Sequence, residues 1–172
     1  MALDPNKPTM SKEEQQSATR KTFGDNKLLE TGAETFDLDS CKSGVVETRN
    51  GPAFRVSIRM SVAAGSNGPN KPGDRYEEVR FFSLTDDGKI DDEAENFGRN
   101  YGAIKRMAYA FFGGKHEREP GRFPSGSGGE SFTPWYALEH YPADCGQISG
   151  ELTQYTTGGG ETRNGMRSIT SA

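Results

Sequence analysis

Arginine and aromatic side chains recur together along two consecutive stretches of this chain, at 53–62 and 75–84. The candidates are Arg55, Arg59, Arg75, Tyr76, Arg80 and Phe82. Cations that follow phosphates, and rings on which bases stack, are what a protein needs to hold a single nucleic-acid strand without reading its sequence. We therefore predict one exposed nucleic-acid-binding face. In the alternative, Arg55 and Arg59 are only the solvated side of a strand and Phe82 belongs to the core.

Two further groups of candidate residues lie in the second half of the chain. Trp135 and Tyr136, in the segment TPWYALEHY, either offer a stacking platform or close one end of the fold. Because a single tryptophan is more often buried than exposed, closure is favoured. Tyr155, Arg163 and Arg167 flank a glycine-rich loop. They suit a finger that wraps a strand, and equally an ordinary solvated hairpin tip.

Patterns for catalysis or for metal binding are weak. His116 and His140 stand alone, and the acidic residues at 86–93 form one contiguous turn, whereas a two-metal site needs acids from several elements. Cys41 and Cys145 are far apart and lack zinc-ligand spacing. Reduced thiols are favoured, with a disulfide left open. We expect a protein that is not an enzyme and has no metal or cofactor.

Composition limits the size and the surface of the fold. A chain of 172 residues that is 31% hydrophobic, with 22 Gly and 9 Pro, fits one domain with long loops. The net charge of −4 means that a surface for nucleic acid must be a local patch. No apolar run is long enough to cross a bilayer or to act as a signal core. We expect a cytoplasmic protein without membrane contact.

The hydrophobic pattern predicts where the elements lie. Residues 1–35 contain few aliphatic side chains and predict a mobile arm. The folded domain is expected over 36–172, with a long loop at 115–144. Within it, strict alternation from Phe54 to Val62 indicates a half-buried strand, joined to a strand at 36–48 by a turn at Asn50-Gly51.

A third strand is predicted over 75–84, with Val79 and Phe81 facing inward. An amphipathic helix follows, capped by Asp91 or Asp92 and ended at Gly113-Gly114. A second hairpin ends the chain. The peptide Glu-Thr-Arg-Asn-Gly occurs at 47–51 and again at 161–165, which we interpret as shared turn chemistry.

The predicted order is strand, strand, strand, helix, strand, strand. It is the order of the oligonucleotide-binding (OB) fold, a five-stranded Greek-key barrel. We therefore expect a mainly β fold of this type, with one helix between the third and fourth strands. The second and third strands and the loops of the first and last hairpins are where such barrels hold oligonucleotides.

The stretch from Val45 to Gly114 resembles bacteriophage single-stranded DNA-binding proteins and their uncharacterised relatives. The resemblance lies in the hairpin ETRNGPAFRVSIRMSV, in the Gly73-Asp74-Arg75 entry to the third strand, and in the helix FGRNYGAIKRMAYAFFGG. It implies a phage-encoded protein that coats single-stranded DNA during replication or recombination in the host cell cytoplasm. RNA is the alternative ligand, and a homo-oligomer and replication or recombination proteins are the candidate partners.

A rival interpretation is a non-catalytic structural or protein-interaction module, such as a virion component, on the same barrel. The acidic isoelectric point, near 5.3, favours this rival. A strand-coating protein should bind cooperatively and should lose affinity as salt rises, because neutralised phosphates release counterions.

Overall fold

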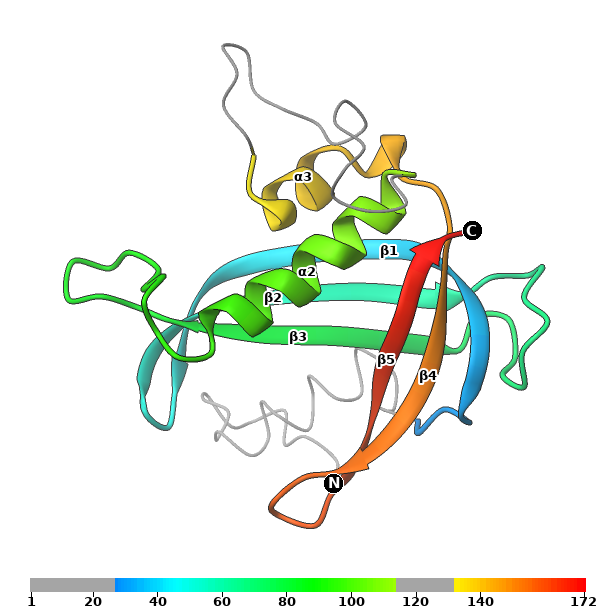
Figure 1. The fold of residues 1–172 in the computed structure, drawn as a ribbon, viewed down its shortest axis with the longest axis horizontal. Helices are drawn as coiled ribbons and strands as arrows, with labels where there is room; N and C mark the ends of the chain where they lie inside the picture. The colour runs from blue at the N-terminus through cyan, green and yellow to red at the C-terminus, as the bar shows by residue number, and fades with distance from the viewer. Residues whose placement is uncertain (1–26, 114–131) are drawn as a thin grey trace, which may run out of the picture.

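A computed structural model describes residues 27–113 and 132–172 (Figure 1). The elements, in chain order, are β1 (Gly32–Thr48), β2 (Gly51–Val62), β3 (Arg75–Ser83), α2 (Phe97–Phe111), α3 (Pro134–His140), the short 3-10 helix η1 (Pro142–Asp144), β4 (Ile148–Thr156) and β5 (Thr162–Ser171). The prediction of a mainly β, five-stranded fold is confirmed. No helix in these two ranges is long and apolar enough to cross a membrane.

The strands form one antiparallel sheet in the order β3-β2-β1-β4-β5. The long strand β1 joins its two halves: Gly32–Phe36 pairs with β4, and the part from Phe36 onward pairs with β2. The register shifts between Leu38 and Ser40, and such an irregularity bends a strand. Within the described residues no ladder joins β3 to β5, so the sheet is open between these two edges.

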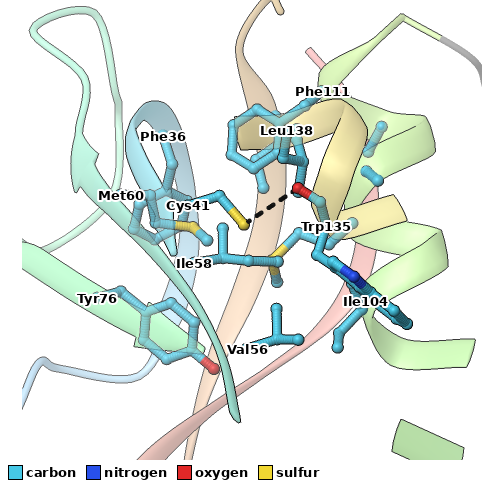
Figure 2. Packing of buried hydrophobic residues seen from close by; sticks show 14 of the residues in the cluster. Phe36, Cys41, Val56, Ile58, Met60, Tyr76, Ile104, Phe111, Trp135 and Leu138 are labelled. Atoms are coloured by element: carbon cyan, nitrogen blue, oxygen red, sulfur yellow. Dashed lines mark hydrogen bonds between the residues drawn. The ribbon is translucent and has the colours of Figure 1, made fainter. Parts of the chain in front are cut away.

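The core lies between the sheet and the two helices (Figure 2). The predicted alternation of β2 is confirmed, because Val56, Ile58, Met60 and Val62 are all buried. Ile104 and Phe111 of α2, and Trp135 and Leu138 of α3, pack against the face that these β2 side chains form. Period-2 alternation therefore located one face of β2 correctly from the sequence alone.

Helix α2 begins later than predicted. It starts at Phe97 after Asn96, which makes no side-chain cap, while Asp91 accepts a hydrogen bond from Glu93 N–H in the turn before it. The expected cap at Asp91 or Asp92 is wrong, because the helix begins five or more residues later and Asp91 stabilises the preceding turn instead. The predicted end is confirmed at Gly113, which has a φ of 78°.

Helix α2 connects the two open edges of the sheet (Figure 1). The side-chain amide of Asn100 donates to the carbonyl oxygen of Phe81 on β3, at 2.9 Å. The Ser171 hydroxyl of β5 donates to the carbonyl oxygen of Ala110, at 2.8 Å. The helix is therefore hydrogen-bonded to both open edges of the sheet.

The expected boundaries of the arm and of the long loop need correction. Strand β1 begins at Gly32, and Leu29 is only 1% exposed. Asn164 Oδ1 accepts from Leu29 N–H at 2.8 Å, so this aliphatic residue anchors the segment that a composition average over 35 residues had classed as mobile. Residues 132–144 form α3 and η1 rather than loop, with Thr133 as the N-cap. The rest of both predictions, at 1–26 and 114–131, lies outside the described residues.

The repeated Glu-Thr-Arg-Asn-Gly peptide does not form the same turn twice. The first copy ends in the β1–β2 turn, where Gly51 has a φ of 106°. In the second copy, Asn164 and Gly165 lie within β5, opposite Gln154 and Thr153. The glycines just before the second copy make that turn, with Gly160 at a φ of 83°. The interpretation as shared turn chemistry is therefore wrong.

Candidate nucleic-acid interface

The register between β2 and β3 separates the predicted side chains onto two faces. Residues directly opposite each other in an antiparallel pair lie on the same face of the sheet. The pairs are Phe54 with Phe82, Val56 with Arg80 and Met60 with Tyr76 on the core face, and Arg55 with Phe81, Arg59 with Glu77 and Ser61 with Arg75 on the other. The prediction that Arg55, Arg59, Arg75, Tyr76, Arg80 and Phe82 share one exposed face is therefore wrong.

Three of the predicted stacking rings belong to the core. Phe82, Tyr76 and Trp135 are 2%, 5% and 8% exposed. The ring centroids of Phe82 and Trp135 lie 5.5 Å apart, and those of Phe54 and Trp135 lie 5.6 Å apart. Rings packed in this way cannot stack on bases. Of the two alternatives for Trp135, closure of the core is the one that the geometry supports.

A polar network on the core face holds Arg80. Its Nε and Nη2 lie 2.7 and 2.6 Å from Oε1 of Glu78, and the hydroxyl of Tyr76 donates to the other oxygen of the same carboxylate. Burial and then the Glu78 charge raise the pKa of Tyr76, and Tyr155 adds a smaller effect of the same sign. Tyr76 therefore stays a hydrogen-bond donor, and Arg80 neutralises a buried carboxylate rather than facing a ligand.

The opposite face of β1, β2 and β3 carries what we call the outer patch: Lys42, Arg55, Ser57, Arg59, Glu77 and Phe81. Glu77 bridges the two arginines, with Arg55 Nη2 at 3.2 Å from Oε1 and Arg59 Nε at 2.7 Å from Oε2. Phe81, directly opposite Arg55, is 47% exposed. The patch therefore combines an accessible ring with three cations and one carboxylate.

Ser57 lies between Arg55 and Arg59 on β2 and carries an unsatisfied hydroxyl. The residue is 3% exposed, and its Oγ has no hydrogen-bond partner within the described part of the chain. A buried hydroxyl without a partner is costly and is rare in folded proteins. Because this atom is fully buried, a ligand that lies across the patch would reach it only after a neighbouring side chain moved.

Arg75 lies at the end of the same face that is less favourable for binding a phosphate. It is paired with Ser61, whose hydroxyl donates to Asp39 at 2.9 Å. Asp37 is also paired with Ser61, from the β1 side. Two carboxylates therefore lie beside Ser61 at this end, and the positive character of this face is concentrated around Arg55 and Arg59.

The residues predicted on the last hairpin form a separate group, because β4 and β5 lie at the other end of the sheet order from β2 and β3. Arg163 binds Glu161 at 2.8 Å and Arg167 binds Glu151 at 2.7 Å. Each hydrogen-bonded charge pair raises the pKa of its arginine, and Arg167 lowers the pKa of Glu151. Tyr155 is exposed opposite Arg163. Pairs this exposed are weak and easily exchanged for a ligand.

The sequence did not reveal the exposed ring of Phe81, nor the rings that surround Tyr136, which was itself a candidate and is 39% exposed. Phe81 was predicted to face the core because it lies two residues after Val79 and so shares its side of the strand. Only its pairing with Arg55 on β2 shows that it faces outward. A second ring cluster lies on and beside α3. There Tyr136 stacks on His140 with ring centroids 3.9 Å apart, and Phe132 lies 4.7 Å from Tyr136 and 5.7 Å from Tyr141.

Neither a metal site among the described residues nor a related protein adds to the site above. Within residues 27–113 and 132–172, no group of three or more His, Cys, Asp or Glu side chains could hold a metal ion. No protein-family model, curated protein or solved structure matches this chain. The geometry of the outer patch and of the neighbouring elements therefore carries the functional argument.

Proposed function

We propose that this chain is an OB-type, single-stranded DNA-binding protein, phage-encoded, that coats exposed strands in replication or recombination and catalyses no reaction. The strand order along the chain, the long first strand shared by two halves of the sheet and the helix between the third and fourth strands support the OB type. RNA as a ligand, self-association and recruitment of replication or recombination proteins in the host cytoplasm are part of the same proposal.

The observation that carries this proposal is the exposed Phe81 ring beside Arg55 on the face of the second and third strands. That face is where OB folds hold oligonucleotides. A base would stack on Phe81, while phosphates would bind Arg55 and Arg59, and movement of these arginines from Glu77 would open the Ser57 hydroxyl to the ligand. Stacking is tolerant of sequence because every base has a π-face, which suits a coating protein.

Binding of a phosphate requires Arg55 and Arg59 to exchange Glu77 for the ligand. Surface ion pairs of this kind contribute about 0–1 kcal/mol each, so the exchange is energetically accessible. The exchange also implies that Glu77 opposes binding, since its charge stays near the incoming phosphate. Affinity would then depend on stacking as well as on charge.

The test is a titration of fluorescein-labelled oligothymidine at low and high salt, comparing the wild type with Phe81→Ala and Val45→Ala. The labelled strand is the better reporter, because Trp135 is buried. Loss of one stacked base costs about 1–3 kcal/mol, so Phe81→Ala should bind roughly 5- to 150-fold more weakly. Val45 is 61% exposed but opposite Phe54 on the other side of the sheet, so Val45→Ala should bind as the wild type does.

Absence of any binding by the wild type at low salt would reject the proposal. Binding that Phe81→Ala leaves unchanged would place the site elsewhere than the outer patch. Circular dichroism of both variants is the control for folding, and because both side chains are largely exposed, both should match the wild type.

A second candidate is a protein-interaction module, which the ring cluster of Phe132, Tyr136, His140 and Tyr141 favours. Exposed aromatic side chains are enriched at protein interfaces. The finding that Arg55, Arg59, Arg80, Arg163 and Arg167 all bind carboxylates fits this candidate too. No shift of oligothymidine at low salt would favour this candidate over DNA binding.

A further inference from the structure

The exposed side of α2 carries two arginines, Arg99 and Arg106, that no carboxylate of the described fold neutralises. The helix contains Arg99, Lys105 and Arg106 and no acidic residue, in a chain with a net charge of −4. Arg99 and Arg106 are exposed, and the side chain of neither forms a hydrogen bond or an ion pair with any residue in the described ranges. This distinguishes them from Arg55 and Arg59, which share a carboxylate.

These arginines share one face of the helix. They are seven positions apart, which is about two turns and about 10.5 Å along the axis. Tyr109, three positions after Arg106, continues the same face, and the Lys105 ammonium lies 5.9 Å from the centre of the Tyr109 ring. The face is therefore a basic strip with an aromatic side chain at its C-terminal end.

Gly102 lies between the two arginines and Gly98 lies just before Arg99, and no contact among residues 27–113 and 132–172 requires a glycine at either position. A Cβ atom added at Gly98 or at Gly102 would meet no other atom within 4 Å, and neither has a positive φ. A glycine inside a helix costs about 0.5–1 kcal/mol relative to alanine. No packing among the described residues explains that cost, and the open position at Gly102 leaves room for another molecule's backbone to approach the helix between the two arginines.

The strip and the outer patch lie on opposite sides of the fold, and the free edge of β3 separates them. Asn100, next to Arg99, donates to the carbonyl oxygen of Phe81, so the start of α2 is fixed against the free edge of β3 (Figure 1). A strand stacked on Phe81 that passed over this edge would reach Arg99 and then Arg106. One nucleic-acid strand that bends around this edge could therefore contact both surfaces with its phosphates.

We propose that the exposed face of α2 is a second contact surface for the same single strand, with phosphates on Arg99 and Arg106 and the backbone passing over Gly98 and Gly102. This inference rests on the proposed function. The positive charge of this face favours a polyanion as the ligand. The open surface at the glycines favours a polyanion that carries its charge on its backbone, as a nucleic acid does.

The experiment measures binding of labelled oligothymidines of about 5 and about 15 nucleotides, which span the site sizes of OB folds, over a range of salt. The variants are Arg99→Gln with Arg106→Gln, and Gly102→Leu. The control is Lys71→Gln with Lys89→Gln, which removes two exposed positive charges elsewhere. Thermal unfolding checks the fold, and Gly102→Leu should be at least as stable as the wild type, because its Cβ enters open space.

The arginine variant should weaken binding of the longer strand and reduce the salt slope, d log K/d log [salt], by about 1.4 in magnitude, since each phosphate on a single strand contributes about 0.7. Gly102→Leu should weaken binding of the longer strand, although it removes no charge from the protein. The shorter strand, held by the outer patch, should bind all variants equally.

The outcomes separate the two proposals. If the wild type binds neither strand, the proposed function fails and the second surface fails with it. If the wild type binds and both α2 variants match it at both lengths, only the second surface is refuted. An equal loss in the lysine control would also refute it, because the effect would then be one of overall charge.

Discussion

Replacing Glu77 by glutamine tests the outer patch most directly, because this carboxylate is bound to both of its arginines. A phosphate on the same guanidinium groups would lie about 5 Å from the carboxylate. Two like charges at that distance repel by about 0.8 kcal/mol at the dielectric constant of water, and by about 3 kcal/mol at an effective value of 20. The Glu77 side chain is 31% exposed, so the lower part of this range applies, about 1 kcal/mol.

Glu77→Gln should therefore bind oligothymidine about 5-fold more tightly at low salt, with a salt slope steeper by about 0.7. The same substitution removes two half-exposed ion pairs, so it should lower the free energy of unfolding, by no more than about 2 kcal/mol. Fluorescence anisotropy at several salt concentrations and urea unfolding measure the two effects. Tighter binding by a less stable protein would be hard to explain by a general change in the fold.

Glu151→Gln is the matched control, because Glu151 binds Arg167 at 2.7 Å at the other end of the sheet order. It removes the same charge from the whole protein but leaves the outer patch intact. If Glu77→Gln binds no more tightly than wild type, phosphates do not bind between Arg55 and Arg59. If Glu151→Gln gives the larger gain, the last hairpin is the contact surface instead.

Leu29→Ala should lower the free energy of unfolding by about 2–5 kcal/mol, whereas Leu28→Ala, at a largely exposed neighbour, should change it by less than about 1 kcal/mol in urea unfolding. Burial raises the pKa of Cys41 and of Cys145 from 9.0 to about 12, so both thiols should react with Ellman's reagent at pH 8 far more slowly in the folded protein than in urea. Since the unfolded chain loses these protons first, the free energy of unfolding should fall as pH rises from 9 to 12. Ser57→Ala should raise the free energy of unfolding by about 1 kcal/mol and weaken oligothymidine binding. An unchanged free energy of unfolding would mean that the Ser57 hydroxyl already has a hydrogen-bond partner.

Features that depend on local pattern could be predicted from the sequence. The buried face of β2 follows from strict alternation between Phe54 and Val62, and the end of α2 follows from a glycine that adopts a positive φ at Gly113. In both cases the residues of the element itself are sufficient for the prediction, without contacts to distant segments. The number of strands and their order along the chain follow from the same kind of evidence.

The face of β3 could not be predicted, because both of its sides carry apolar residues: Tyr76 and Phe82 on one, Val79 and Phe81 on the other. The pairing with β2 decides between them, and that pairing depends on the loop between the two strands. A buried carboxylate from β1, Glu34, accepts hydrogen bonds from the Ser66 hydroxyl and from the backbone of Asn70 in that loop. No local pattern reveals such a contact between distant segments.

The two proposed surfaces should contribute differently to binding, because their arginines differ in whether a carboxylate already binds them. Arg55 and Arg59 already share Glu77, so a phosphate that arrives there displaces a carboxylate, and the net charge gained is small. Arg99 and Arg106 have no such partner among the described residues, so each phosphate that they bind should release close to the full share of counterions. Stacking on Phe81 would then fix where the strand lies, while α2 would supply most of the salt-dependent affinity. An acidic protein could in this way hold a polyanion without an overall positive charge.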